Sequence, residues 1–361
     1  MAQEFAIPKG STVVVTGANG YIASHIADIL LGLGYLVRGT VRSEKPWLNQ
    51  LFEEKYGKGK FESVVLPDLA AEGVYKDVVK GAAGFLHVAS DVSFSSDPNQ
   101  VIPGVIKLNE NALSAAAQEA SIKRFVLTSS SSAVLWPTAD NEGLIVDEST
   151  SKSPRSPMQL SSETEEIDLF ADTWNEATVK AAWDSNTPAE LKPPSVYGAS
   201  KTEGERAAWK WIKENKPGFV FNAILPNFNT GPSLHPEING STMGGVRSLL
   251  QGKEGFMRML PAQHFIDVRD TARLHVAALL DTSIKDERIF GFVHEFNWTD
   301  IVFVLRGLRP DNKAIPDPPA NENRDRSVVK PKIRAEQILN SFWGRSWTGF
   351  NDSVAAGIEG Y

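Results

Sequence analysis

The chain has 361 residues, of which 42% are hydrophobic, so it is long enough to bury one large core or a core with a smaller second one. Its formal net charge of -7, from 37 basic and 44 acidic residues, argues against a general nucleic-acid or anionic-membrane surface, because such a surface would repel phosphates. It contains no cysteine, which excludes a disulfide framework, a thiolate nucleophile and a cysteine-rich zinc site.

The first half of the chain alternates short β-branched runs with longer amphipathic segments. Residues 13–16 predict a buried strand, and residues 21–31 predict a helix that places Ile22, Ile26 and Ile29 on one face. Further strands are expected at residues 35–41, 61–66, 84–89, 124–129 and 219–225, and further helices at residues 47–56, 101–120 and 197–216. This alternation indicates an α/β fold of the Rossmann type, a doubly wound parallel sheet with helices on both faces.

The first predicted domain covers residues 1–230 and contains this sheet. A stretch rich in Ser, Pro and acidic residues interrupts it at about residues 138–194. We expect this stretch to be an insertion on the domain surface, with a helical centre over residues 163–184.

The pattern loosens in the last third of the chain, where Pro and Gly punctuate short mixed elements. Residues 231–361 are expected to form mainly a smaller substrate-binding lobe, with some chain returning to the Rossmann domain. Asp270 is expected to cap a helix over residues 271–280.

A glycine-rich loop lies between the first strand and the first helix. Residues 17–23 read Gly-Ala-Asn-Gly-Tyr-Ile-Ala, so small residues stand at Gly17, Gly20 and Ala23. Small residues let the backbone turn sharply and approach a pyrophosphate, while the helix N-terminus offers free N–H groups to that anion. The strand before the loop and the helix after it favour a dinucleotide-binding loop over a chance pattern.

The second strand predicts the type of dinucleotide. An enzyme that binds NAD carries an acidic residue about 20 residues after the glycine loop, which holds the ribose hydroxyls. This chain has Arg38 and Arg42 there and no acidic residue before Glu44. Arginine suits a 2′-phosphate because its planar guanidinium keeps its positive charge. The sequence therefore predicts NADP(H), with Asp68 and Leu69, after the third strand, near the adenine.

Tyr197 and Lys201 are the candidate catalytic pair, in the hexapeptide Val-Tyr-Gly-Ala-Ser-Lys at residues 196–201. Positions i and i+4 of a helix share one face. A free tyrosine has a pKa of about 10, and a nearby ammonium is expected to lower that pKa by favouring the phenolate. Tyr197 can then act as a general acid toward a carbonyl oxygen, and Lys201 can reach the nicotinamide ribose.

Four serines, Ser129 to Ser132, follow the fifth predicted strand. Ligands of open α/β sheets bind outside the carboxyl ends of the strands. A serine at that place can hydrogen-bond a developing alkoxide. Ser130 is the first candidate for this role and Ser131 the second, because adjacent serines leave the register open.

Taken together, these motifs resemble the extended short-chain dehydrogenases/reductases. The likeness rests on Thr-Gly-Ala-Asn-Gly-Tyr-Ile-Ala at 16–23, Arg38, Arg42, Thr-Ser-Ser at 128–130, Tyr-Gly-Ala-Ser-Lys at 197–201, His-Val-Ala-Ser at 87–90, Leu-Pro-Asn at 225–227, and residues 202–210 and 265–270. The chain is most similar to the branch of dihydroflavonol reductases, yeast methylglyoxal reductases and fungal or yeast NADPH-dependent aldehyde and carbonyl reductases. The likeness covers about residues 10–310.

The resemblance implies a role for each matching position. The catalytic set would be Ser130, Tyr197 and Lys201. Residues that would line the dinucleotide are Gly17, Ala18, Asn19, Gly20, Tyr21, Ile22, Arg38, Arg42, Asp68 and Leu69, and at its nicotinamide end Ala89, Thr128, Pro226, Asn227 and Ser241, beside Tyr197 and Lys201. Many relatives carry a fourth catalytic residue, an asparagine on the helix before the fifth strand. Here the alignment places Lys107 or Leu108 at that position, with Asn109 and Asn111 nearby.

The substrate pocket is expected to include Phe94, Phe228 and Met243, because these apolar side chains lie near the motifs. No metal site is expected, since none of the six histidines lies at metal-ligand spacing from another histidine or an acidic residue.

The leading interpretation is an enzyme that reduces aldehydes or ketones to alcohols with NADPH, with Tyr197 as the proton donor. The same residues suit an alcohol or sterol dehydrogenase that uses NADP, or a nucleotide-sugar epimerase. A regulator that senses NADPH without turnover is a third interpretation, although such a protein usually loses the tyrosine. We expect a cytoplasmic monomer or homodimer whose partner is a small carbonyl compound, because the sequence has neither a signal peptide nor a membrane-spanning apolar run.

Overall fold

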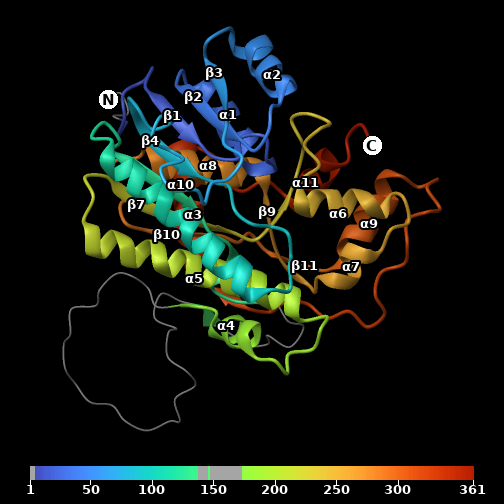
Figure 1. The fold of residues 1–361 in the computed structure, drawn as a ribbon. Coiled ribbons are helices and arrows are strands. Elements are labelled where there is room, and N and C mark those ends of the chain that lie inside the picture. The colour runs from blue at the N-terminus through green and yellow to red at the C-terminus, as the bar shows by residue number, and fades with distance from the viewer. Residues whose placement is uncertain (1–4, 137–144, 147–172) are drawn as a thin grey trace.

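The computed structural model describes residues 5–136, 145–146 and 173–361. A seven-stranded sheet forms its centre, in the order β10-β7-β5-β4-β1-β2-β3, and every neighbouring pair of strands is parallel (Figure 1). The strands are β1 Thr12–Val15, β2 Leu36–Val41, β3 Phe61–Val65, β4 Ala82–His87, β5 Arg124–Thr128, β7 Val220–Pro226 and β10 Arg288–Gly291. The predicted Rossmann-type α/β fold is confirmed by this sheet.

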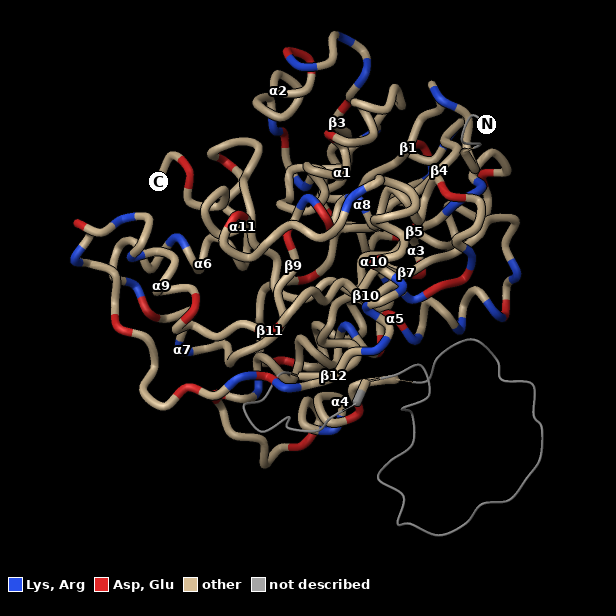
Figure 2. Tube along the Cα trace, turned by 180° about the vertical axis from the view of Figure 1, so that it is seen from behind, with Lys and Arg blue, Asp and Glu red and all other residues tan. Residues whose placement is uncertain are grey.

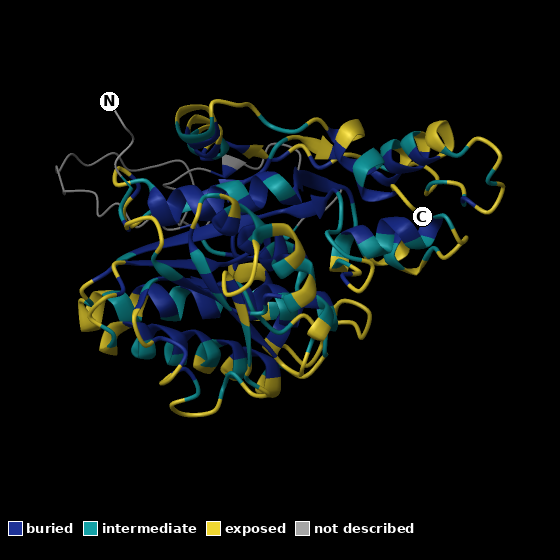
Figure 3. Ribbon diagram, turned by 90° about the horizontal axis from the view of Figure 1, so that it is seen from above, coloured by how far each residue is buried: buried dark blue, intermediate teal, exposed yellow. Residues whose placement is uncertain are grey.

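Helices cover both faces of the sheet because its strands carry apolar side chains on both sides. In β1, Val13 and Val15 point to one face and Val14 points to the other. The helices against the first face are α1 Tyr21–Gly32, α2 Pro46–Tyr56, α8 Val268–Leu280 and α10 Lys332–Trp343; those against the second are α3 Pro98–Gln118 and α5 Lys192–Asn215. Figure 3 shows the strands buried between these layers, with exposed residues gathered on loops and outer helix faces.

Two elements differ from their predicted bounds in ways that affect the cavity described below. Strand β4 ends at His87 instead of residue 89, because the N–H groups of Val88 and Ala89 turn to donate to Thr16 Oγ1 at 2.9 and 3.0 Å. Helix α5 begins at Lys192, five residues before the predicted start, because prolines are accepted in the first turn of a helix, where the missing N–H has no partner in any case.

A second group of elements packs beside the carboxyl ends of the strands. It contains the sheet β8 Phe228–Thr230, β9 Gln263–Asp267 and β11 Glu295–Phe296, and the helices α6 Ser241–Leu249, α7 Gly255–Met259, α9 Trp298–Leu308 and α11 Phe350–Gly357. These elements share one apolar cluster, which includes Phe228, Trp298 and Phe350. The chain returns to the main sheet through α8, β10 and α10, whose apolar residues belong mainly to the clusters of that sheet.

Asp270 is not the cap of α8, contrary to the sequence expectation. The helix begins three residues earlier, and Asp267 caps it by accepting a hydrogen bond from the Arg269 N–H at 2.8 Å. Asp270 lies within the first turn and accepts hydrogen bonds from Arg273 Nη1 at 2.5 Å and from the Thr348 N–H at 2.7 Å.

Much of the predicted insertion, including residues 163–172 of its expected helical centre, lies outside the described residues. The described part contains strand β6 Ile145–Val146, which pairs in parallel with β12 Val328–Val329, and helix α4 Glu176–Trp183, which packs on α5. Charged residues of both signs are interspersed over the described surface (Figure 2). Within the described ranges, no helix combines the length and the apolar character needed to cross a bilayer.

Candidate active site

A cavity of about 1220 Å³ lies at the carboxyl ends of the parallel strands. The loops that follow β1, β2, β3, β4, β5 and β7 all contribute to its wall, and the start of α6 closes it from the other side. This edge is where open α/β sheets bind ligands, because all strand ends and helix N-termini meet there.

The glycine loop after β1 forms one wall of the cavity. Gly17 has a φ of 66°, a left-handed conformation that side chains rarely adopt, and a Cβ on it would lie 3.2 Å from the Ala89 Cβ. Helix α1 begins directly after Gly20, and no side chain caps its first N–H groups. The loop therefore leaves room for a ligand and presents uncapped N–H groups, which suits an anion such as a pyrophosphate.

Arg42, and not Arg38, reaches the cavity from the second strand. Arg38 lies in the middle of β2, where its guanidinium pairs with Glu62 and donates to the carbonyl oxygens of Val78 and Lys80 at 2.7 and 3.1 Å. The assignment of Arg38 to the dinucleotide is therefore corrected, because its N–H groups are used at the side of the sheet. Beyond the strand end, Arg42, Ser43 and Lys45 line the cavity together.

Asp68 and Leu69 line the same part of the cavity, as expected from their place after β3. Asn111 on α3 holds this segment, since its Nδ2 donates to the Leu69 carbonyl at 3.2 Å and to the Ala71 carbonyl at 3.1 Å. Asn111 thus supports the cavity wall from behind.

Tyr197 and Lys201 both line the cavity from helix α5. The hydroxyls of Ser130 and Ser132 lie close enough to the Tyr197 hydroxyl to favour its phenolate, and so they act to lower its pKa. The Phe94 ring stacks on the Tyr197 ring, with centroids 4.8 Å apart, and the Phe94 backbone has a φ of 53°. A left-handed phenylalanine is strained, so the surrounding structure must hold it there. The Tyr197 ring is thus held against the Phe94 ring, and its hydroxyl lies near the serine run.

Ser130, rather than Ser131, contacts the tyrosine. The serine run bends into a 3₁₀ turn over Ser131–Ala133, in which Ser130 Oγ accepts hydrogen bonds from the N–H of Ser132 at 3.2 Å and from its hydroxyl at 2.8 Å. Sequence reasoning missed Ser132, because only this turn brings the second residue after Ser130 back to the tyrosine. Ser131 also lines the cavity.

Burial dominates the protonation of the catalytic pair. It raises the pKa of Tyr197, and the hydrogen bonds from Ser130 and Ser132 oppose that rise only in part. The expected lowering by the Lys201 ammonium is corrected, because the ammonium lies 6.0 Å from the ring centroid and burial outweighs it. Burial also lowers the pKa of Lys201 to about 8, against the attraction of Glu205 and Asp91.

Asn109 is the asparagine of α3 that contacts the catalytic helix. It is buried, and its Nδ2 donates to the Gly204 carbonyl of α5 at 3.0 Å. Of the two residues that the alignment favoured, Leu108 lines the cavity and Lys107 is exposed. The three residues therefore have different surroundings although they are adjacent in sequence.

Most of the predicted site residues lie in the wall of this one cavity. Those that line it are Gly17, Asn19, Gly20, Tyr21, Ile22, Arg42, Asp68, Leu69, Ala89, Thr128, Ser130, Tyr197, Lys201, Pro226, Asn227 and Ser241, with Phe94 and Phe228. Residues that sequence reasoning missed include Ser43, Lys45, Asp91, Trp136 and Phe256. The signal for Ser43 and Lys45 was their place just after Arg42, and that for Asp91 its place after the His-Val-Ala-Ser motif, whereas Trp136 and Phe256 have none in the sequence.

Two further predicted residues do not line the cavity. Met243 is fully buried in the cluster of the second group, where its sulfur occupies the space in which Gly357 has no side chain, so its assignment to the substrate pocket is corrected. Ala18 points away from the cavity into the core, where its Cβ lies 2.6 Å from the position that a Cβ on Gly39 would take.

The residues present fit a dinucleotide with a nicotinamide end near Tyr197. The glycine loop lines the cavity without a side chain at Gly17, where a Cβ would press on Ala89, and the uncapped start of α1 provides donors for the diphosphate. Lys201 is 6% exposed, and among the described residues none accepts a hydrogen bond from its ammonium. A buried cation with open donors suits the hydroxyls of a ribose.

Known proteins share both the sequence and the fold of this chain. Residues 14–223 match the 3-beta hydroxysteroid dehydrogenase/isomerase family. A ketoreductase of Aspergillus novofumigatus, nvfG, is 41% identical over 353 residues, covering 98% of this chain and 97% of the relative. Aldehyde reductase 2 of Sporidiobolus salmonicolor is 37% identical over 352 residues, covering 96% and 95%. The structure of Gre2 from Candida albicans in complex with NADPH is 25% identical, with a TM-score of 0.75 and 98% of each chain covered.

The expected resemblance is confirmed by these matches, which extend over nearly the whole chain. The chain belongs to the 3-beta hydroxysteroid dehydrogenase/isomerase family, within the extended short-chain dehydrogenases/reductases, and is an oxidoreductase that uses a nicotinamide cofactor.

Proposed function

We propose that the protein reduces aldehydes or ketones to alcohols with NADPH. The observation that carries the proposal is that Tyr197, Ser130 and Ser132 line the same cavity as the glycine loop, with the two serine hydroxyls close enough to the phenol to act on its pKa. A proton donor and a second hydroxyl therefore converge where a carbonyl oxygen would develop charge. The ketoreductase and aldehyde reductase relatives, similar over nearly their full length, support this reaction type.

Arg42 and Lys45 favour NADPH over NADH. Both line the end of the cavity beyond β2, and no acidic residue precedes Glu44 in this segment to hold the ribose hydroxyls of NADH. Arginine provides a planar fork for a 2′-phosphate, and lysine adds a point charge. The NADPH complex of the Candida albicans relative supports the same choice.

Each catalytic side chain has a distinct task in this proposal. Bound NADPH supplies a hydride. Ser130 and Tyr197 donate hydrogen bonds to the carbonyl oxygen, and the Tyr197 phenol then transfers its proton to that oxygen. Burial keeps the phenol protonated at neutral pH, since it raises the pKa of Tyr197. Lys201 holds the ribose, and its charge stabilises the phenolate that remains after proton transfer.

The substrate end of the cavity favours a neutral, apolar carbonyl compound. Its wall contains the aromatic side chains of Phe94, Trp136, Phe228 and Phe256. Such surfaces bind apolar groups by removing them from water, and they exclude water from the reacting atoms.

The first test is turnover by Tyr197→Phe. NADPH oxidation is measured with aliphatic aldehydes, aryl ketones, keto esters and flavanonols, and with an excess of nucleotide sugar. We expect one of the carbonyl classes to be reduced, and Tyr197→Phe to lose about 10²- to 10⁴-fold in kcat because a general acid contributes that much. Its NADPH affinity should persist, because the ring and its stacking partner remain.

The matched control is Tyr56→Phe. Tyr56 lies at the end of α2, outside the cavity, and its hydroxyl donates hydrogen bonds to the backbone carbonyl and the carboxylate of Asp28. This variant should keep full turnover. Equal turnover by both variants would reject Tyr197 as the proton donor. Conversion of a nucleotide sugar to its epimer without net oxidation of NADPH, together with no reduction of any carbonyl class, would reject carbonyl reduction as the function.

A further inference from the structure

Helix α5 carries a third ionisable side chain on the face of Tyr197 and Lys201. Glu205 follows Lys201 by one helical turn, as Lys201 follows Tyr197. Tyr197 and Lys201 line the cavity, whereas Glu205 meets the sheet beside it. Its side chain is only 1% exposed, and that of its ion-pair partner Arg288, on β10, is 5% exposed. A carboxylate this deeply buried needs a complete set of partners.

Three different elements supply those partners. Glu205 Oε2 accepts hydrogen bonds from Ser129 Oγ at 2.6 Å and from Arg288 Nη2 at 3.1 Å. Glu205 Oε1 accepts from Arg288 Nε at 2.6 Å and from Trp209 Nε1 at 3.1 Å. The carboxylate and the guanidinium thus form a two-pronged pair, a geometry that fixes orientation as well as distance.

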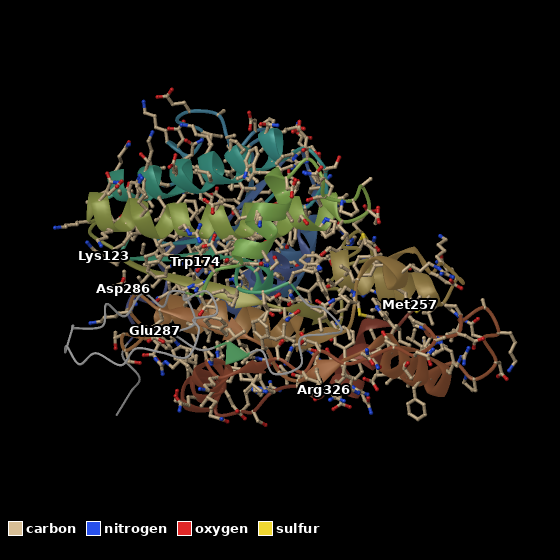
Figure 4. All side chains as sticks on the ribbon, turned by 90° about the horizontal axis from the view of Figure 1, so that it is seen from below. Lys123, Trp174, Met257, Asp286, Glu287 and Arg326 are labelled. Atoms are coloured by element: carbon tan, nitrogen blue, oxygen red, sulfur yellow. The ribbon has the colours of Figure 1, made fainter. Side chains whose placement is uncertain are left out.

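Arg288 is itself fixed on its other side. Its Nη1 donates to the Thr173 carbonyl at 2.9 Å, and its guanidinium lies 4.2 Å from the ring centroid of Trp174, which is labelled in Figure 4. The next residue, Asn175, donates from Nδ2 to the Ser132 carbonyl at 2.9 Å. One short segment, residues 173–175, therefore holds both the partner of Glu205 and the serine run.

We propose that Glu205 is a positioning residue of the active site, whose carboxylate sets helix α5 against the serine run through Ser129 and Arg288. Ser129 is the chain neighbour of Ser130, so the bond from Ser129 to Glu205 ties the strand end to the helix that carries the tyrosine. This tie would hold Ser130 and Tyr197 at one relative position in the cavity wall. The inference rests on the proposed function, because it assigns Glu205 a task in that reaction.

Glu205 also acts on the charge of Lys201. The ionisable groups that face this ammonium are Glu205 and Tyr197 on α5, Asp91 in the loop after β4, and His87 on β4. His87 is neutral, since burial lowers its pKa to about 3. Glu205 therefore provides the largest attraction that keeps the buried lysine protonated, ahead of Asp91.

The first experiment removes the hydroxyl through which Ser129, which itself lines the cavity, is bonded to Glu205. Ser129→Ala leaves the pair of Glu205 and Arg288 intact, and the matched control Ser341→Ala changes a serine on α10 far from the cavity. With NADPH and the best carbonyl substrate of the panel, Ser129→Ala should lose about 10- to 10²-fold in kcat, the effect of misplacing a reacting group. Its NADPH Kd, from fluorescence titration, should stay unchanged.

The second experiment separates positioning from stability. Glu205→Gln removes the carboxylate charge that pairs with Arg288, and the double variant Glu205→Leu with Arg288→Met replaces the pair with apolar side chains, which commonly restores stability. We expect the double variant to recover the Tm of the unaltered chain but not its kcat. In Glu205→Gln, the alkaline fall of kcat/KM for NADPH should move to lower pH, because Lys201 loses the largest attraction on its ammonium.

Three outcomes would overturn the inference. The first is a kcat of Ser129→Ala equal to that of Ser341→Ala. The second is a double variant that recovers kcat together with Tm, which would make the pair merely structural. The third is a pH profile of Glu205→Gln that coincides with that of the unaltered chain. An unaltered chain that reduces no carbonyl compound would instead refute the proposed function, and this inference with it.

Discussion

Arg38 and Arg42 are alike in sequence but differ in what surrounds them. Arg38 is held by Glu62 and by two backbone carbonyls, whereas Arg42 lines the cavity beyond the end of β2. A position on a strand decides which groups a side chain can reach, and four residues along a strand carry the side chain about 13 Å. Only the arginine at the strand end can therefore meet a ligand at the sheet edge.

Arg42→Ala should weaken NADPH by about 10- to 10²-fold and NADH much less, because a hydrogen bond to a charged group contributes about 1.5–3 kcal/mol. Fluorescence titration with each dinucleotide measures the difference. Arg38→Ala is the control and should alter the NADPH Kd little. A larger loss of NADPH affinity in Arg38→Ala than in Arg42→Ala would contradict the assignment.

The charge of Lys201 is expected to make the productive binding of NADPH weaker at alkaline pH. Its folded-state pKa of about 8 lies below the ordinary lysine value, so the ammonium loses its proton as the pH rises through about 8. We expect kcat/KM for NADPH, which reports groups of the free enzyme, to fall over that range. An arginine at this position keeps its charge over that pH range. The kcat/KM of Lys201→Arg for NADPH, although lower, should therefore not change with pH there. A fall shared by both proteins would assign the titration to another group.

At the scale of elements, strand β2 and the glycine loop pack with no space between them. A Cβ on Gly39 would lie 2.6 Å from the Ala18 Cβ and 2.8 Å from the Phe61 ring. This close approach lets the glycine loop lie directly over the second strand. The glycine is therefore needed for packing, although its backbone conformation is an ordinary extended one.

Gly39→Ala should lower the free energy of unfolding by about 1–3 kcal/mol, the cost of overpacking a filled core. It should also weaken NADPH, because the loop must move. Gly307→Ala is the matched control on helix α9, where a Cβ meets nothing within 4 Å. That change should be neutral or stabilise the protein by up to about 1 kcal/mol. Chemical denaturation of both variants measures the difference, and equal stability would contradict the packing account.

The elements of the sheet were predictable because their apolar pattern repeats along the chain. β1, β2, β3 and β5 lie within a residue or two of their expected ranges, since each is a β-branched run bounded by turn residues. Helix ends were less predictable, because they depend on local chemistry. The prolines at the start of α5 indicate in sequence that a helix cannot extend through them, but they are accepted in its first turn. Similarly, Asp267 caps α8 in place of Asp270.

At the scale of the whole molecule, the cavity joins residues from Gly17 to Gln263, far apart in sequence. Motifs located those of its residues that follow a strand of the parallel sheet, because such positions are spaced regularly. Phe256 carries no such signal, since it reaches the cavity only through the packing of the second group of elements. Trp136 carries none either, since it reaches the cavity only beyond the turn that follows β5. Ser132 and Glu205 depend on a turn and on an ion pair, which appear only when the chain is folded.

The cavity at the strand ends has a consequence for the order in which the cofactor and the substrate bind. The glycine loop and the aromatic wall share one continuous space, with Tyr197 between them. A nicotinamide ring bound beside Tyr197 would itself become part of the surface on which the carbonyl compound rests. The carbonyl site is then incomplete until the dinucleotide has entered.

Binding should therefore follow a compulsory order, in which NADPH enters first and NADP⁺ departs last. Product-inhibition patterns measure this order: NADP⁺ should compete with NADPH, whereas the alcohol should not. Tight binding of the carbonyl compound to the dinucleotide-free protein in calorimetry would contradict it. In a cell that depletes its NADPH, the carbonyl site would then also become empty, since the bound coenzyme would form one wall of that site.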